Sequence, residues 1–222
     1  MKKRLLIIGA GGFGRELLGW ALAIPAAERE WDVAGFLDAN PDALAGFPCD
    51  HRVVADPAVY APGPDDLFVP AVGDPATKLR LCRALDARGG RFATVIHPTV
   101  TIGPFCRIGR GCVLCPGTIL CTNVTLGDFV VMNTHSGAGH DAVLGAGCTL
   151  SSHVDITGAA RLGEGVFLGS HASVLPRVAV GDFAVVGAGS VVLRNVPPRA
   201  TVMGVPAKQI AGFDAPPPGS AP

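Results

Sequence analysis

Large aliphatic residues recur at every sixth position through residues 102–192 of this chain. The residue two places earlier is small or modest in size, as at Cys112 and Ala142, and the residue after is often glycine. Only Ala138 interrupts the series. The sixteen positions are Ile102, Ile108, Leu114, Leu120, Leu126, Met132, Ala138, Leu144, Leu150, Ile156, Leu162, Leu168, Val174, Val180, Val186 and Val192. A series of this length predicts one structural unit repeated along the chain.

A period of six residues fits neither an α-helix nor the two-residue alternation of a long strand. It is typical of a parallel β-helix, in which each hexapeptide supplies one short strand and one turn. Three hexapeptides complete one triangular coil, so each large aliphatic residue should point inward and stack on its equivalents roughly 4.8 Å away. The sequence therefore predicts a parallel β-helix over residues 97–210.

The first 96 residues show a different pattern, in which short apolar runs alternate with amphipathic segments. Asp74 and Pro75 stand where an N-cap and a first helical turn favour them. We expect helices over 15–23 and 75–88, and strands over 4–9, 33–37, 51–54, 67–72 and 92–96. This alternation predicts a small α/β domain over residues 1–96.

A glycine-rich segment, Gly9–Gly14, joins the first predicted strand to the first predicted helix. Such glycines let the backbone approach a phosphate group at a helix N-terminus. Asp38 ends the second strand, 24 residues after Gly14, where a carboxylate can accept a hydrogen bond from a ribose hydroxyl. NAD would require a second mononucleotide-binding half, which is missing. A nucleotide or nucleotide-sugar is therefore favoured, with a purely structural turn as the alternative.

One hexapeptide departs from the pattern around Ala138, where His135, His140 and Asp141 occur together. A local defect in a regular array is where a functional site is expected. An imidazole, with an ordinary pKa of about 6.5, can accept a proton at neutral pH, and an adjacent carboxylate can fix its tautomer. His140 and Asp141 are therefore candidate catalytic residues; the alternative is that His140 is a surface residue at a corner of the β-helix.

These parts, in this order, resemble the hexapeptide-repeat sugar acyltransferases related to bacillosamine N-acetyltransferase and the sialic acid O-acetyltransferases. The resemblance implies an α/β plus all-β protein, with a Rossmann-like nucleotide-sugar-binding domain before a left-handed β-helix. It also implies a homotrimer that transfers an acetyl group from acetyl-CoA to an amino or hydroxyl group of a nucleotide-linked sugar. The matching segments run to about residue 210 and are Gly9–Gly14, Phe36–Asp38, Ala71–Asp74, Ile96–Pro98, Asn133–Thr134, His140–Asp141 and Gly204–Lys208.

The resemblance assigns roles to individual positions. It makes His140 the general base and Asp141 its partner, with direct transfer and no covalent enzyme intermediate. The residues assigned to coenzyme A are Gly158, whose amide faces the thioester oxygen, and Ser170, Ala188 and Lys208. Those assigned to the sugar nucleotide are Gly11, Gly12, Phe13, Asp38, Gly73 and Asn133. Phe13 is a departure, because many relatives have a histidine there that contacts the sugar nucleotide.

His135, His153 and His171 are each 18 residues apart and should stack at one corner in successive coils. The simplest interpretation is a polar ladder at a subunit interface. Imidazoles also bind zinc, and γ-class carbonic anhydrases hold zinc between subunits of the same kind of β-helix. Thr99 stands where the third ligand would be, so we expect no metal and keep such a hydratase as one alternative function. A non-catalytic sugar-nucleotide-binding protein is the other.

Composition restricts the partners and the cellular compartment that we expect for this protein. The 222 residues are 49% hydrophobic and 16% charged, with a net charge of zero and no basic block, which argues against nucleic acid as a partner. The CxxC segment from Cys112 to Cys115 fits core packing better than a zinc or redox motif, and we expect the seven cysteines to be reduced thiols.

Arg15 and Glu16 interrupt the apolar N-terminal run, so we expect a cytoplasmic protein with no signal peptide or membrane span. Residues 211–222 are rich in Pro, Gly and Ala and are predicted to be a disordered tail.

Overall fold

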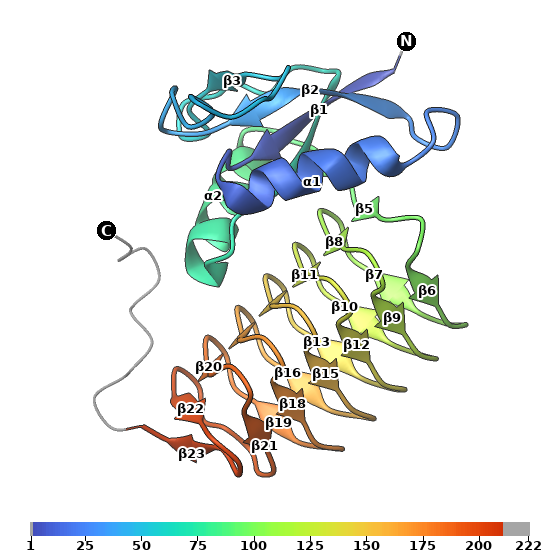
Figure 1. Ribbon diagram of the computed structural model, residues 1–222, viewed down its shortest axis with the longest axis vertical. Coiled ribbons are helices and arrows are strands. Elements are labelled where there is room, and N and C mark those ends of the chain that lie inside the picture. The colour runs from blue at the N-terminus through green and yellow to red at the C-terminus, as the bar shows by residue number, and fades with distance from the viewer. Residues whose placement is uncertain (1, 211–222) are drawn as a thin grey trace.

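The computed structural model describes residues 2–210, and the predicted tail over 211–222 lies outside the described residues. A small α/β unit stands beside one face of a long β-helix, with its helix α1 between its own sheet and the first coils (Figure 1). This is the predicted architecture, a parallel α/β unit followed by a β-helix, and it is confirmed. Neither helix among the described residues has the length and apolar character that a membrane span requires.

The small unit is a parallel four-stranded sheet in the order β3-β2-β1-β4. Its helix α1 begins at Gly12 rather than at the predicted Arg15, because the turn after β1 is very short. A Cβ atom at Gly14 would lie 2.1 Å from the Gly9 carbonyl oxygen, so helix and strand approach as closely as only glycine permits. The elements are β1 (Lys3–Ile8), α1 (Gly12–Ala23), β2 (Trp31–Leu37), β3 (Val53–Ala55), β4 (Asp66–Pro70) and α2 (Pro75–Ala87).

The β-helix has three sheets of mostly two-residue strands. We call them the docked, groove and outer sheets. The docked sheet contains β5 (Val95–Ile96), β8 (Val113–Leu114), β11 (Val131–Met132), β14 (Thr149–Leu150), β17 (Phe167–Leu168), β20 (Val185–Val186), β22 (Thr201–Met203) and β23 (Lys208–Gln209). The groove sheet contains β6 (Thr101–Ile102), β9 (Ile119–Leu120), β12 (Gly137–Ala138), β15 (Asp155–Ile156), β18 (Ser173–Val174) and β21 (Val191–Val192). The outer sheet contains β7 (Arg107–Ile108), β10 (Thr125–Leu126), β13 (Val143–Leu144), β16 (Arg161–Leu162) and β19 (Ala179–Val180). From β5 to β21 the strands are parallel and each pairs with the one 18 residues away, as Leu126 pairs with Leu144, whereas β22 pairs with β20 at a spacing of 16 and with β23 antiparallel.

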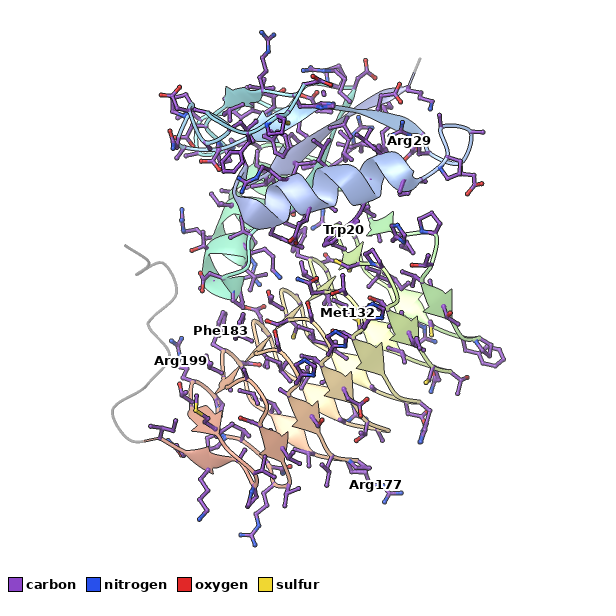
Figure 2. All side chains as sticks on the ribbon, viewed as in Figure 1. Trp20, Arg29, Met132, Arg177, Phe183 and Arg199 are labelled. Atoms are coloured by element: carbon purple, nitrogen blue, oxygen red, sulfur yellow. The ribbon has the colours of Figure 1, made fainter. Side chains whose placement is uncertain are left out.

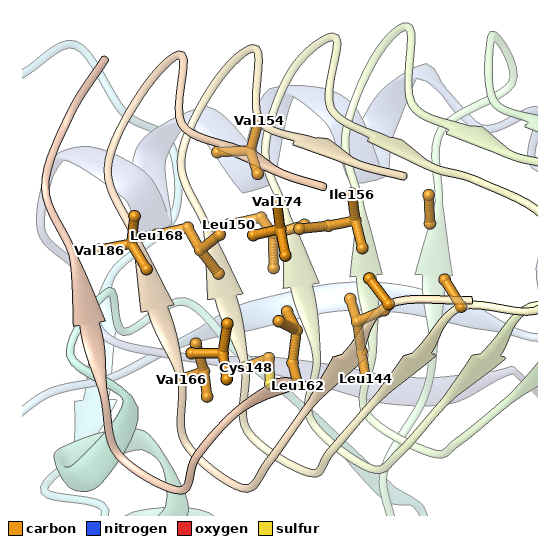
Figure 3. Close-up of a cluster of buried hydrophobic side chains, with 14 of the residues drawn as sticks. Leu144, Cys148, Leu150, Val154, Ile156, Leu162, Val166, Leu168, Val174 and Val186 are labelled. Atoms are coloured by element: carbon orange, nitrogen blue, oxygen red, sulfur yellow. The ribbon is translucent and has the colours of Figure 1, made fainter. Parts of the chain in front are cut away.

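The large aliphatic positions fill the interior of the prism as predicted, and Figure 3 shows Leu150, Leu168 and Val186 stacked in successive coils. Cys112 and Cys148 are fully buried in this core. Ile102 is the exception among the predicted inward positions. It is 42% exposed, because it belongs to the first coil and has no coil below it.

The predicted strand over residues 92–96 is divided between the two parts. Phe92 forms an isolated bridge with Phe68 of the small sheet, whereas Val95–Ile96 is the first strand of the docked sheet. The Val95 N–H donates to the Cys112 carbonyl, so this strand is held by the coil that follows it. The small sheet therefore has four strands rather than the expected five, and the chain passes into the β-helix within this segment.

Candidate active site

His140 and Asp141 lie at the corner between the groove and outer sheets, which we call the His140 corner. Nδ1 of His140 is 2.8 Å from Oδ2 of Asp141, and the Asn123 amide donates to Oδ1 at 2.7 Å. The hydrogen bond from His140, and then that from Asn123, hold the pKa of Asp141 below its usual range. The carboxylate is thus an ionised acceptor that orients the ring. Asn123 was not predicted, although its position one coil before Asp141 was a signal for it.

The other ring nitrogen of His140 is available for chemistry. The ring lies on the backbone of Gly158 in the next coil, where a Cβ atom would stand 2.4 Å from Nε2. Both side chains of the pair are open to solvent, at 65% for His140 and 51% for Asp141. The Gly158 N–H has no hydrogen-bond partner within residues 2–210. A proton acceptor and a free N–H donor therefore lie next to each other at an exposed corner.

A shallow groove of about 360 Å³ runs beside this corner over the groove sheet. Gly137 leaves space in this groove, because a Cβ atom there would meet only Oδ1 of Asp155, at 3.8 Å. The groove is lined by Ile119, Cys121, Gly137, Ala138, Gly139, Asp155, Ile156, Thr157 and Gly158.

Three of the predicted sugar-binding residues meet in a second place, between the small unit and the docked sheet. Phe13, Gly73 and Asn133 line a pocket of about 150 Å³, which we call the interdomain pocket. Phe13 also packs edge-on against Trp20, with ring centroids 6.1 Å apart, and Trp20 lies on the side of α1 toward the coils (Figure 2). The other lining residues are Glu16, Val131, Thr149, Leu150, Ser151 and Phe167.

Asp38 lies in a pocket of about 300 Å³ at the carboxyl ends of the small sheet's strands. Its two carboxylate oxygens accept from the N–H groups of Ala10, at 2.8 Å, and Asn40, at 2.9 Å. Asp38 therefore holds the glycine loop in place. At Gly11 and Gly73 a Cβ atom would meet no heavy atom within 4 Å, and at Gly12 only the tip of Arg15 at 4.0 Å. The space at these three glycines is open to a ligand.

The residues predicted to bind coenzyme A are divided between corners. Gly158 belongs to the His140 corner, whereas Ser170 and Ala188 lie at the corner between the docked and groove sheets, which we call the His135 corner. The N–H groups of Ser170 and Ala188 have no hydrogen-bond partners in the described part of the chain. Lys208 is exposed on β23. One chain therefore places Gly158 on one edge of the groove sheet, Ser170 and Ala188 on the other edge, and Lys208 on the docked sheet, not in a single site.

The same division separates His140 from the interdomain pocket. Asn133 lies at the His135 corner, and the small unit covers the docked sheet. Arg177, which is two coils beyond Asp141 at the His140 corner, lies on the side of the β-helix away from the small unit (Figure 2). Within one chain, His140 therefore faces away from the pocket that contains Phe13, Gly73 and Asn133.

The three ladder histidines stack as predicted. The ring centroids of His135 and His153 are 5.1 Å apart at 10°, and those of His153 and His171 are 4.7 Å apart at 3°. Parallel, stacked rings do not direct their nitrogen lone pairs at one point. In residues 2–210 no group of three or more His, Cys, Asp or Glu residues is arranged to hold a metal ion.

Comparison with known families and structures agrees with both parts of the fold. The family of the PglD N-terminal domain matches residues 4–85, and the hexapeptide repeat of succinyl-transferase matches residues 99–127 and 160–194. No curated protein sequence matches the chain.

Solved structures match over nearly the whole chain. PerB from Caulobacter crescentus, in complex with CoA and GDP-perosamine, is 32% identical over 93% of this chain and 96% of its own, with a TM-score of 0.81. A variant of perosamine N-acetyltransferase from the same organism is 30% identical over 93% of this chain and 96% of its own, with a TM-score of 0.82. The acetyltransferase domain of PglB from Neisseria gonorrhoeae, in complex with acetyl coenzyme A, is 27% identical over 95% of this chain and 100% of its own, with a TM-score of 0.85.

Proposed function

We propose a function from one premise: this chain belongs to the sugar acetyltransferases that join a PglD N-terminal domain to a hexapeptide-repeat β-helix. It transfers the acetyl group of acetyl-CoA to an amino group of a nucleotide-linked sugar. The relatives crystallised with CoA and GDP-perosamine, or with acetyl coenzyme A, support both substrates. The observation that carries the proposal is the pair of His140 and Asp141 with Nε2 free beside the unpaired amide of Gly158.

His140 acts as the general base. Asp141 accepts a hydrogen bond from the Nδ1–H group, so Nε2 carries the lone pair that takes a proton from the attacking amine. The amine nitrogen forms a bond to the thioester carbonyl carbon, and the carbon–sulfur bond then breaks. The proton held by His140 passes to the departing thiolate, which leaves as coenzyme A. The enzyme forms no covalent bond at any step.

Gly158 supplies the oxyanion donor. As the amine attacks, negative charge develops on the thioester oxygen, and a free backbone N–H beside Nε2 stabilises it. The unpaired N–H groups of Ser170 and Ala188, one coil apart, offer further donors to the amide groups of the coenzyme arm. Lys208 is the proposed partner of a coenzyme phosphate.

The sugar nucleotide binds in the small unit and the interdomain pocket. The open space at Gly11, Gly12 and Gly73 accepts the phosphates near the N-terminus of α1. Asp38 keeps the loop in that shape, and Phe13 and Asn133 face the sugar. Phe13 offers an apolar ring where many relatives use histidine, which favours an acceptor with a methyl or deoxy position against it.

The working enzyme is a homotrimer with its active sites between chains. The separation of His140 from the interdomain pocket within one chain supports this proposal. The His140 corner of one chain meets the His135 corner and interdomain pocket of its neighbour, so that base, coenzyme amides and acceptor converge. A variant that lacks His140, or one in which the interdomain pocket cannot bind the acceptor, would therefore have no complete active site.

A thiol-release assay with acetyl-CoA tests the function. The acceptor panel is nucleotide-linked amino sugars on GDP, UDP and dTDP, each with its hydroxyl counterpart that lacks the amine. The proposal expects release of coenzyme A, and an acetylated product by mass, with at least one amino sugar and with none of the hydroxyl counterparts. Release with the hydroxyl counterparts alone would identify an O-acetyltransferase instead.

A further inference from the structure

Lys78 is a fully buried lysine at the contact between the two parts of the protein. It stands in the apolar stripe of α2, whose other buried residues are Pro75, Leu79, Cys82 and Leu85. Within residues 2–210 no carboxylate forms an ion pair with it. Lysine is almost never fully buried without a charged partner, so this position requires an explanation.

Both hydrogen bonds of Lys78 cross to the β-helix. Nζ donates to the Cys148 carbonyl at 3.1 Å and to Thr149 Oγ1 at 2.7 Å. Asp74 is a carboxylate that influences the ammonium group, and it accepts the Thr77 N–H as the N-cap of α2. Burial lowers the pKa of Lys78 to about 8, and the neighbouring Cys148, Cys82, Cys112 and Asp74 only oppose this shift. Stability does not explain the choice of residue, because an apolar side chain of similar size would avoid the burial of a charge.

Thr149 is a polar residue with apolar neighbours on both sides in its row. The outward residues that run along the docked sheet are Val95, Val113, Val131, Thr149, Phe167, Val185 and Thr201. Thr149 is only 6% exposed, and the surface that it does present lines the interdomain pocket with Phe13, Gly73 and Asn133.

The chemistry of the pair fixes the direction of the threonine hydroxyl. A lysine ammonium has three donors and no acceptor, so Thr149 Oγ1 accepts the hydrogen bond from Lys78. The hydroxyl proton must then be donated elsewhere, and Thr149 Oγ1 donates to no residue within the described chain. The remaining direction is the pocket. The ammonium group also polarises this hydroxyl and makes it a stronger donor.

We propose that Lys78 is a positioning residue and Thr149 a specificity-determining one: Lys78 orients the Thr149 hydroxyl as a donor to an oxygen of the acceptor sugar. The inference rests on the proposed function, because it places the sugar in the interdomain pocket. It gives the buried lysine a role in acceptor recognition and none in the binding of acetyl-CoA.

The test compares Thr149→Val, Lys78→Met and the double variant in the thiol-release assay, with the preferred nucleotide sugar. Each single variant should raise the acceptor KM about tenfold, as expected for the loss of one hydrogen bond to a buried partner. The KM for acetyl-CoA should stay within about twofold of wild type, since the coenzyme does not contact this pair. The double variant should be no worse than either single variant, because both changes remove the same interaction.

Conservative variants and a matched control complete the experiment. Thr149→Ser and Lys78→Arg retain the hydroxyl and the charge, and each should restore most of the acceptor affinity. Arg83→Gln removes an ion pair between the same helix and Glu164, at 2.5 Å, away from the pocket, and should leave both KM values unchanged. An acceptor KM unchanged in Thr149→Val and Lys78→Met, or both KM values raised alike, would overturn the proposal.

Calorimetric binding of the nucleotide sugar separates this inference from the proposed function. Loss of binding in Thr149→Val supports the role of the pair, whether or not the wild type turns over. An absence of turnover in the wild type would overturn the proposed acetyl transfer but not the role of the pair. Equal binding by wild type and Thr149→Val overturns the role of the pair and leaves acetyl transfer standing where the wild type turns over.

Discussion

His140 lies so close to Gly158 of the next coil that a Cβ atom at Gly158 would stand 2.4 Å from Nε2. Gly158→Ala should therefore displace the imidazole from its position beside the thioester and lower kcat by roughly 10²-fold, the order of loss that a misplacement of about 1 Å causes. Steady-state kinetics measures the effect, and Gly19→Ala is the control, because a Cβ atom there meets no heavy atom within 4 Å. Wild-type turnover in Gly158→Ala would show that this contact has no catalytic role.

His140→Ala should lower kcat by roughly 10²–10⁴-fold, the usual contribution of a positioned general base, and leave acetyl-CoA affinity unchanged. The side chain is exposed, so its removal leaves no core cavity. Higher pH should partly restore turnover, because more of the amine acceptor is then deprotonated. His135→Ala, in the ladder, is the control and should alter assembly or stability more than chemistry. Loss of turnover in His135→Ala with the trimer intact, while His140→Ala is nearly normal, would mean that we have assigned the wrong histidine.

Val174→Asp should unfold the β-helix. Val174 is fully buried in the prism, and an unpaired charge there costs several kcal/mol. Circular dichroism and thermal melting measure the loss. The neighbouring Ser173→Asp places the same charge on the outward surface of β18 and should remain folded. A folded, active Val174→Asp protein would contradict the inward assignment.

Alkaline pH should destabilise the fold through its buried thiols. Burial raises the pKa of Cys82, Cys112 and Cys148 to about 12 from the ordinary 9.0. These thiols stay protonated in the folded chain while the unfolded chain ionises, so the free energy of unfolding is unaffected below pH 9 and falls between about 9 and 12. Urea denaturation from pH 8 to 10.5 should show this fall, and Cys148→Ala should reduce its slope.

Lys78 acts in the opposite direction and provides a control. Its folded pKa is lowered from 10.5 to about 8, so in the window between these values the unfolded chain binds more protons and stability rises with pH. Lys78→Met removes this rise and should make the alkaline loss steeper. A stability that does not change between pH 8 and 10.5, in wild type and in both variants, would contradict the burial of these groups.

The six-residue period was enough to predict the β-helix, because each coil repeats the same inward position and needs no information from a distant part of the chain. The same regularity exposed the defect at Ala138 and therefore His140 and Asp141, which are neighbours in sequence. Asn123 was within reach of the same logic, since residues 18 apart stack at a corner. The division of residues 92–96 could not be predicted in this way, because Phe92 pairs with the small sheet and Val95 pairs with the docked sheet.

The pairing of Lys78 with Thr149 could not be predicted from the sequence, for a physical reason. The two residues are 71 positions apart and meet only because α2 docks on the outward face of the β-helix. The position of Lys78 in an apolar helical stripe indicates that the lysine is buried. The residues near it in the sequence do not indicate which residue accepts its hydrogen bond. The separation of His140 from Asn133 is similar, because the six residues between them cross the whole width of the groove sheet.

A mixing experiment tests the central claim, an acetyltransferase site shared between chains, most directly. His140→Ala lacks the base and Asn133→Ala impairs the acceptor half, so each assembly alone should be nearly inactive with a limiting nucleotide sugar. When the two variants are co-expressed in equal amounts, a chain with intact His140 faces a chain with intact Asn133 in about a quarter of the sites of a random trimer. The account predicts that thiol release recovers to about that fraction of wild type. Mixed assemblies as inactive as the separate variants would contradict it.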